Sequence, residues 1–179
     1  MGRLVHRKGI DTVLRALPTI IQTCPNVAYV IAGTGPDRPR LERLAACLGV
    51  RDRLCFVGDI GHNRLPLYYS AADLFVMPAR QNPPDVEGFG LVFLEANACG
   101  TPVIGGRTGG IPEAIREGET GLLVPPNAPD ALAAAATHVL TNPEVAEGLG
   151  QQGRHRVVHE ANWDVIADRI YDLLMCESA

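Results

Sequence analysis

The feature that most constrains the fold is a regular alternation of short apolar runs with longer amphipathic segments. The runs are rich in β-branched residues and end in Gly or Pro. They occupy residues 27–33 (VAYVIAG), 53–58 (RLCFVG), 74–78 (LFVMP), 101–106 (TPVIGG) and, more weakly, 121–125 (GLLVP). Such a run is typical of a strand that is buried on both faces of a parallel sheet. Strands that alternate with helices form βαβ units, so the sequence predicts an α/β fold with a doubly wound, Rossmann-like parallel sheet.

Helical periodicity fills the spaces between these runs and then replaces them. After Pro125 no strand pattern follows, and alanine-rich or amphipathic stretches continue to the end of the chain. We therefore predict a single domain over residues 1–179 with an all-helical C-terminal tail from about residue 129. The predicted helices span residues 11–22, 39–49, 91–99, 130–140, 144–161 and 164–175.

The beginning of the chain is unusual for such a fold. Only Gly2 to Val5 precede the first helix signal at Lys8-Gly9, whereas a doubly wound sheet usually opens with a complete strand. We therefore expect the chain to begin inside its first strand, as part of a larger protein or as a shortened one.

Composition excludes several classes of function. The 179 residues carry a formal net charge of -4 and no dense Lys/Arg cluster, which argues against binding to nucleic acid or to an acidic membrane surface. No apolar run approaches the ~20 residues of a membrane-spanning helix. The first residues lack the apolar core of a signal peptide, so we predict a cytoplasmic location.

The five cysteines are scattered and form no C-x-x-C pair, which argues against a zinc ribbon or a thioredoxin-like redox site. Free cysteine is among the most frequently buried residue types. We therefore expect most of the five to be small buried apolar residues.

Chemistry is concentrated in EGFGLVFLE, from Glu87 to Glu95. Gly88 and Gly90 stand just before a predicted helix, where unpaired N–H groups and the positive end of the helix dipole favour a phosphate. Glu95 lies about one turn inside that helix. It would repel a phosphate, but it could accept hydrogen bonds from neighbouring sugar hydroxyls. A simple turn with an acidic first helical turn is the alternative interpretation.

Two further elements would suit an anion. Arg3 and Lys8 lie near the end of the first strand, and arginine and lysine both bind phosphate oxygens. TGGIPEAI, residues 108–115, places a second glycine pair before a helix start and predicts an anion-binding nest. Solvated loop charges and an ordinary loop-to-helix turn are the alternatives. His6, between the two cations, is either a loop residue or a ligand contact.

Two other sites are not supported. AGTGP, residues 32–36, resembles a dinucleotide fingerprint, but Arg38 occupies the place of its third glycine. His155 and His159 stand one helical turn apart and could bind zinc, but no third ligand is evident.

Taken in order, these motifs carry a family resemblance. GRLVHRKGID, AGTGPDRPRLERLA, FVGDI, YYSAADLFVMPAR, EGFGLVFLEANACGTPVIGGRTGGIPEAI, GETGLLVPP and the closing NWDVIADRIYDLL span nearly the whole chain. Together they resemble the C-terminal half of a retaining glycosyltransferase of family 4. That resemblance implies the GT-B architecture of two facing Rossmann-like domains, of which this chain is the half that binds the nucleotide-sugar donor.

The resemblance also implies roles for individual residues. Arg3 and Lys8 would neutralise the donor diphosphate, Glu87 would contact the transferred sugar near the reacting carbon, and these three are the catalytic candidates. Glu95 would hold the ribose hydroxyls. The other donor-binding candidates are Gly88, Phe89, Gly90, Leu91 and Val92 around the helix start, and Gly58 and Asp59 beside the base.

The expected reaction uses no cofactor and no metal, because the sequence holds no D-x-D to bind one. PPDVEGFGLVFLEA, residues 83–96, resembles mannosyltransferases that use GDP-mannose, and UDP-sugar enzymes are the second possibility. The implied partner is an N-terminal acceptor domain, through which peripheral membrane association would occur. A binding module without activity of its own is the remaining alternative.

Overall fold

The computed structural model describes residues 2–81 and 88–176. The described strands form two sheets, and every pairing within them is parallel. In one sheet β1 (Tyr29–Ala32) pairs with β2 (Leu54–Gly58). In the other, β4 (Val103–Gly106) lies between β3 (Phe75–Met77) and β5 (Leu122–Val124). All five strands fall within the apolar runs, which confirms the α/β prediction.

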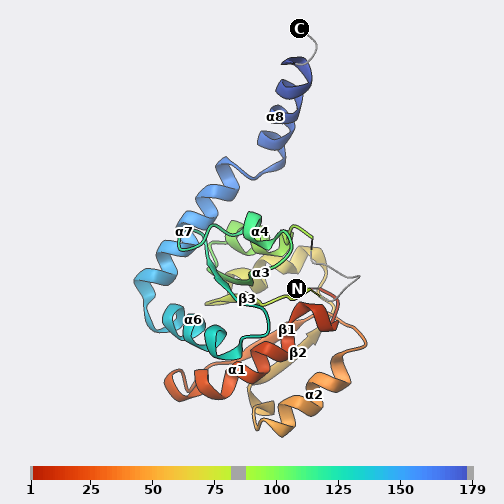
Figure 1. The fold of residues 1–179 in the computed structure, drawn as a ribbon, viewed down its shortest axis with the longest axis vertical. Helices are drawn as coiled ribbons and strands as arrows, with labels where there is room; N and C mark the ends of the chain where they lie inside the picture. Colours follow the sequence, from red (N-terminus) through yellow and green to blue (C-terminus); the bar gives the residue numbers. More distant parts are fainter. Residues whose placement is uncertain (1, 82–87, 177–179) are drawn as a thin grey trace.

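Helices connect and cover these strands (Figure 1). The predicted helices are all present within two residues of their expected bounds, and the helical tail begins with α6. The structure adds one short helix, α3, and three single 3₁₀ turns that the sequence pattern did not reveal. The helices are α1 (Ile10–Thr23), α2 (Arg38–Cys47), α3 (Leu65–Ser70), α4 (Leu91–Ala98), α5 (Ile111–Ala114), α6 (Pro129–Thr141), α7 (Pro143–His159) and α8 (Trp163–Cys176), and the turns are η1 (His6–Lys8), η2 (Arg51–Arg53) and η3 (His62–Arg64).

The β3–β4–β5 sheet is covered on both faces. On one face α1 and α6 pack against Ile104 and Val124. On the other face α3, α4 and α5 pack against Val103 and Leu123, around the fully buried ring of Phe93. Helices on both faces of a parallel sheet define the doubly wound arrangement that the sequence predicts.

The β1–β2 sheet is covered less completely. Ile31 packs with residues of α1 and α2, including Leu41. Val30, whose side chain points to the opposite face, is 48% exposed. The expectation that residues 27–33 are buried on both faces is therefore wrong. Val30 is exposed because its side chain belongs to none of the hydrophobic core clusters that the described residues form.

The expectation that most cysteines are buried is also wrong. Of the four cysteines with described side chains, Cys47 and Cys55 are exposed, and Cys24 and Cys99 are partly exposed. Cys55 alternates with the inward-facing Leu54 and Phe56 of β2 and so points away from the core.

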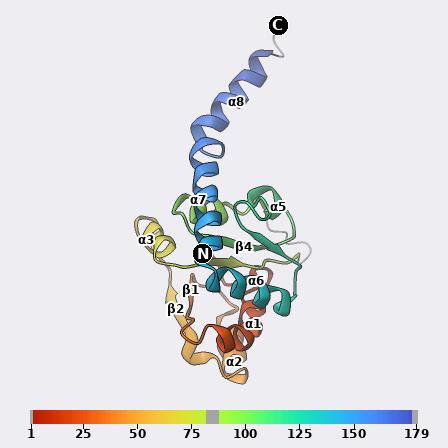
Figure 2. The same ribbon diagram turned by 90° about the vertical axis from the view of Figure 1, so that its left-hand side faces the viewer.

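The C-terminal helices leave the body of the molecule. α7 packs against α4, and α8 then extends away from both sheets, so that the C-terminus lies at the far end of the molecule (Figure 2). Several large apolar side chains of α8 are exposed, among them Trp163, Ile170, Tyr171 and Leu173. Within residues 2–81 and 88–176, no helix combines the length and the apolar character that crossing a membrane would require.

Candidate functional site

The loop before α4 is held against the loop before α5. The backbone N–H of Gly110 donates a hydrogen bond of 3.1 Å to the carbonyl oxygen of Gly88. Gly90 caps α4 with a φ of 81°, a left-handed conformation that glycine adopts without strain. The two glycine elements of the sequence therefore meet in space. The amides of Leu91 and Val92 lie in the first turn of α4, where N–H groups lack partners within the helix.

Glu95 is fixed by a buried tyrosine. The hydroxyl of Tyr69 donates a hydrogen bond of 2.8 Å to Oε2 of Glu95, and only 2% of Tyr69 is exposed. Burial raises the pKa of Tyr69, and the hydrogen bond to Glu95 raises it further, so the tyrosine stays a neutral donor. Glu95 itself is exposed and can still accept through its other oxygen. This orientation is suited to binding a pair of hydroxyl groups.

Tyr69 was missed by sequence reasoning. It lies in α3, 26 positions before Glu95, and α3 carries no strong periodic signal. Only the packing of α3 on α4 brings the two side chains together.

Arg3 precedes the turn η1, and Lys8 ends it. Arg3 is exposed. The backbone of this segment is fixed, because the N–H of Leu4 donates to the carbonyl oxygen of Thr34 at 2.8 Å. The two candidate cations therefore lie close to the C-terminal end of β1.

A buried arginine that the sequence analysis did not identify joins the loop after β3 to α1 and η1. Arg80 follows β3, is 8% exposed, and donates from Nη2 to the carboxylate of Asp11 and, at 3.0 Å, to Oγ1 of Thr12. Its backbone N–H donates to the carbonyl oxygen of Arg7 at 2.8 Å, and its Nη1 lies 3.4 Å from Nε2 of His6. Arg80 thus positions η1, and His6 takes part in that network. The only sequence signal was a charge directly after an apolar strand.

Asp37 and Arg40 extend the same network. Arg40 donates to both carboxylate oxygens of Asp37, at 2.6 and 2.7 Å, and to Asp11 at 3.4 Å. The hydrogen bond from Arg40 holds the pKa of Asp37 below its ordinary value, against the opposing effect of burial. Asp11 is therefore contacted by two guanidinium groups, Arg80 at Oδ1 and Arg40 at Oδ2.

Gly58 and Asp59 lie at the end of β2. The carbonyl oxygen of Gly58 accepts from the N–H of Gly33 at 2.6 Å, which joins the loops that follow β1 and β2. Asp59 is exposed in the next loop. Both residues are thus at the C-terminal edge of their sheet, where ligands bind in open α/β folds.

Thr108 contributes a polar atom that lacks a partner. The residue is 7% exposed, and its Oγ1 makes no hydrogen bond within the described part of the chain. It lies between β4 and the Gly110 amide that binds Gly88. A buried hydroxyl without a partner is costly, and Thr108 carries that cost beside the glycine loop.

The residues on either side of Gly88 have different outcomes. Phe89 is 41% exposed. Glu87 lies outside the described residues, so its role remains a prediction.

The histidine pair considered as a zinc site lies on α7. The rings of His155 and His159 pack 4.5 Å apart. No group of three His, Cys, Asp or Glu that could hold a metal ion occurs in residues 2–81 and 88–176.

A doubly wound fold with glycine loops at helix starts, beyond the C-terminal ends of parallel strands, is typical of a nucleotide-binding domain. Residues 1–156 match the family described as "Glycosyl transferases group 1". The chain belongs to this family, and the expected resemblance is confirmed.

Individual relatives agree with this assignment. The chain is 40% identical over 176 residues to a GDP-mannose-dependent alpha-(1-6)-phosphatidylinositol monomannoside mannosyltransferase of Mycolicibacterium smegmatis, covering 97% of this chain and 46% of that protein. It therefore spans about half the length of this curated relative.

Solved structures are similar as well. Sucrose-phosphate synthase from Thermosynechococcus elongatus matches with a TM-score of 0.83 and 38% identity, over 97% of this chain and 44% of that one. The C-terminal domain of a glycosyl transferase group 1 family protein from Francisella tularensis matches with a TM-score of 0.80 and 27% identity, over 91% of this chain and 84% of that domain. These structural neighbours are GT-B glycosyltransferases, which confirms the fold class expected from the sequence.

Proposed function

We propose that this chain is the donor-binding half of a retaining, metal-independent glycosyltransferase that transfers mannose from GDP-mannose. The observation that carries the proposal is the 40% identity, along nearly the whole chain, to a protein named as a GDP-mannose-dependent mannosyltransferase. The site geometry adds independent support, because the α4 start and the Tyr69–Glu95 pair offer partners for a phosphate and for sugar hydroxyls.

The donor would lie across the C-terminal ends of both sheets. Its diphosphate would contact the first-turn amides of α4 and the charges of Arg3 and Lys8. Glu95, oriented by Tyr69, would accept hydrogen bonds from the ribose hydroxyls. The loop containing Gly58 and Asp59 would lie beside the base. Glu87 would contact the transferred sugar.

This arrangement would stabilise the charges that develop during transfer. When the bond between the sugar and the diphosphate breaks, positive charge grows on the sugar and negative charge on the leaving group. Fixed cations and helix amides directed at the leaving group lower the barrier without a metal. The absence of a D-x-D in the sequence supports transfer without a metal ion. Retention requires the acceptor hydroxyl to attack the face of the sugar from which the diphosphate departs.

The acceptor would be bound largely by a second, N-terminal domain, and any peripheral membrane association would come through that domain. The chain spans 46% of the mannosyltransferase that it resembles. For the chain of 179 residues we therefore expect donor binding with little sugar transfer. Transfer at a rate comparable to that of a complete enzyme would contradict this division of roles.

Equilibrium binding of a nucleotide panel tests the proposal. The chain is titrated with GDP, GDP-mannose, UDP, UDP-glucose and NAD, with thermal unfolding as an independent readout. We expect GDP and GDP-mannose to raise the unfolding midpoint, since a ligand at ~100 times its Kd adds ~2.7 kcal/mol. A shift with UDP compounds alone would replace the donor assignment. No shift with any nucleotide, from a folded chain, would overturn donor binding.

Glu95→Gln and the control Glu144→Gln make the assignment specific. Both are exposed glutamates on helices, but only Glu95 is hydrogen-bonded to Tyr69, and Glu144 lies on α7, outside the glycine loops. Losing the carboxylate at position 95 should weaken GDP binding at least tenfold, whereas the control should bind as the unchanged chain does. Equal affinities of the two variants would remove Glu95 from the site.

A further inference from the structure

α7 contacts the C-terminal ends of both helices that begin at the candidate site. α4 and α5 each start at one of the two glycine loops, so their C-terminal ends point away from the site. α7 packs against α4 (Figure 1), and its side chains reach the last carbonyl groups of both helices. Contacts at these ends determine where the two helices stand without touching a bound nucleotide.

Two glycines bring α7 into close contact with the end of α4. Gly150 and Gly153 are both buried. A Cβ atom at Gly150 would lie 2.2 Å from the carbonyl oxygen of Gly100, and one at Gly153 would lie 2.5 Å from Nδ2 of Asn97. A larger side chain at either position would push the two helices apart. The shape of α7 therefore fixes how it sits on α4.

Two arginines of α7 then bind the carbonyl groups at which the site helices end. Nη1 of Arg154 donates to the carbonyl oxygen of Ala98, the last residue of α4. Arg156 donates from Nη1 to Ala114 at 2.6 Å and from Nη2 to Glu113 at 2.8 Å, the last two carbonyl groups of α5. Such carbonyls lack partners within their helix, and the helix dipole favours a cation beside them. One guanidinium group thus holds each helix end.

The two helices are also joined at their starts, where the N–H of Gly110 donates to the carbonyl oxygen of Gly88. α4 has only 8 residues. A helix of that length is about 12 Å long, so a shift of its C-terminal end moves its first-turn amides by a comparable distance. Hydrogen bonds weaken steeply when their distance and angle depart from the preferred values. Support at the helix ends therefore affects what the glycine loops can bind.

We propose that Arg154 and Arg156 are positioning residues for the donor diphosphate. They hold the C-terminal ends of α4 and α5 against α7, and this fixes the relative position of the two glycine loops. Neither side chain contacts the nucleotide. The inference rests on the proposed function for the identity of the ligand, whereas the support of the loops is a property of the chain alone.

Matched variants remove these contacts one at a time. Arg154→Met and Arg156→Met keep an unbranched apolar stem and lose the donors. Arg15→Met, at an exposed arginine of α1, is the control for the loss of one positive charge. Arg156→Lys keeps the charge, but its compact ammonium group lacks the planar fork with which arginine reaches two acceptors.

The first test measures amide exchange of the chain without a ligand. Phe93 and Gly110 are the reporters, because their N–H groups donate to carbonyl oxygens of the loop before α4. We expect Arg154→Met to speed exchange at Phe93, and Arg156→Met to speed it at Gly110, each by at least about fivefold. The amide of Phe75, at the start of β3, reports opening of the sheet and should exchange as before.

The second test compares the binding of GDP with that of guanosine, which lacks the phosphates. We expect each methionine variant at positions 154 and 156 to raise the Kd of GDP about tenfold and that of guanosine less than about twofold, since the phosphates depend on the glycine loops. Arg156→Lys should recover part of the GDP affinity, and Arg15→Met should bind both ligands normally. Titrations followed by amide chemical shifts measure both constants.

Three results would overturn the proposal. Unchanged exchange at both reporters would show that the arginines do not hold the loops. An equal increase at Phe75 would indicate a general loss of stability, and so would equal weakening of GDP and guanosine. If the unchanged chain binds no GDP, the proposed function fails and the role toward a diphosphate fails with it. The exchange measurement separates that outcome from a failure of the support itself.

Discussion

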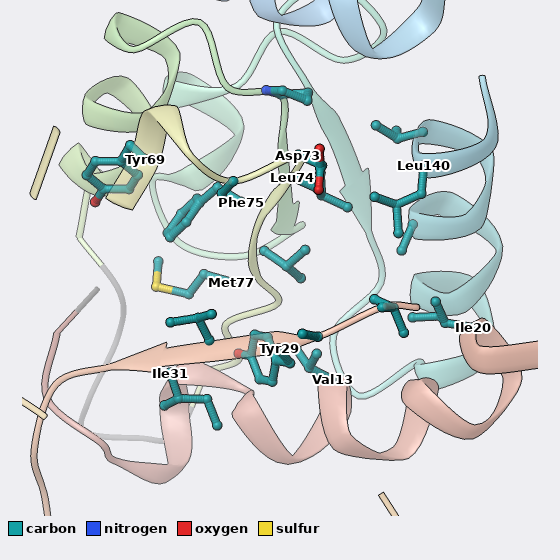
Figure 3. A pocket seen from close by; sticks show the side chains of 18 of the residues that line it. Val13, Ile20, Tyr29, Ile31, Tyr69, Asp73, Leu74, Phe75, Met77 and Leu140 are labelled. Carbon is teal, nitrogen blue, oxygen red and sulfur yellow. The ribbon is translucent and has the colours of Figure 1, made fainter. Parts of the chain in front are cut away.

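The two sheets differ in how completely their neighbours enclose them. In the β3–β4–β5 sheet, Val103 and Ile104 are fully buried, and each of the two faces has its own set of helices. In the β1–β2 sheet, Val30 is 48% exposed, and β1 borders an apolar cavity (Figure 3). Both sheets come from equally apolar sequence runs. The difference shows that a strand's own residues do not determine its burial, because its lateral neighbours and covering helices do.

The candidate site depends on both sheets despite this difference. Glu95 and the α4 start belong to the enclosed sheet, whereas Arg3, Gly58 and Asp59 belong to the open one. Arg80 links the two parts through Asp11, Thr12 and the backbone of Arg7. The donor site therefore depends on the packing of α4 against the enclosed sheet on one side and on the Arg80 contacts to η1 on the other.

The largest expected loss of stability comes from a substitution in the core around the enclosed β3–β4–β5 sheet. Phe93→Ala removes a fully buried ring that packs edge-on against Phe75, with the centroids 5.6 Å apart. We expect a loss of about 3–5 kcal/mol in the free energy of unfolding. The matched variant on the open sheet, Val30→Ala, should change it by less than about 0.5 kcal/mol. Denaturant unfolding measures both, and comparable losses would refute the contrast.

Arg80→Met tests the link between the sheets. The substitution removes the Arg80 contact from the carboxylate of Asp11, which is 6% exposed, and leaves the weaker 3.4 Å contact with Arg40. We expect a loss of about 1–3 kcal/mol in the free energy of unfolding, and faster amide exchange in residues 4–9. Arg116→Met, which removes exposed ion pairs with Glu119 and Glu160, is the control and should change little. An Arg80 variant as stable as this control would show that the link is dispensable.

Tyr69→Phe tests how the enclosed sheet positions Glu95. The ring remains packed against Phe75, and only the 2.8 Å hydrogen bond to Glu95 is lost. We expect a loss of about 1 kcal/mol in stability and a several-fold weaker affinity for GDP, smaller than the effect of Glu95→Gln. Tyr68→Phe, the neighbouring substitution, should bind GDP normally. If Tyr69→Phe also bound normally, Glu95 would not need this support.

The smallest expected effect is the pH-dependent loss of stability when the Asp37 carboxylate, on the side of the open sheet, is removed. Because Arg40 lowers the pKa of Asp37, the ionised carboxylate stabilises the fold above the unfolded-state pKa of about 4. That contribution is lost as the pH falls through the lower pKa of the folded state. We expect Asp37→Asn to cost less than about 1 kcal/mol at pH 7, since Arg40 is 37% exposed. The difference from the unchanged chain should shrink steadily as the pH falls below about 4 toward the folded-state pKa, and a difference that stays constant over that range would contradict the assignment.

Sequence reasoning predicted the elements better than their surroundings. The five apolar runs contain the five described strands, and residues 88–95 (GFGLVFLE) form a loop and a helix, because local pattern and turn chemistry act over a few residues. The roles of Tyr69 and Arg80 were not found, because each depends on contacts between segments far apart in the chain. The exposure of Val30 and Cys55 was mispredicted for the same reason. Apolar residues indicate which segments can be buried, but not whether a partner covers them.

The central claim is that one donor is bound by both sheets. Amide exchange of the chain with and without saturating GDP-mannose tests this claim directly, because it reports each sheet separately. We predict slower exchange in two segments, residues 2–9 around η1 and residues 88–95 at the start of α4, with little change in α6 and α7. Protection confined to one of the two segments, or found elsewhere while GDP-mannose is bound, would contradict the account.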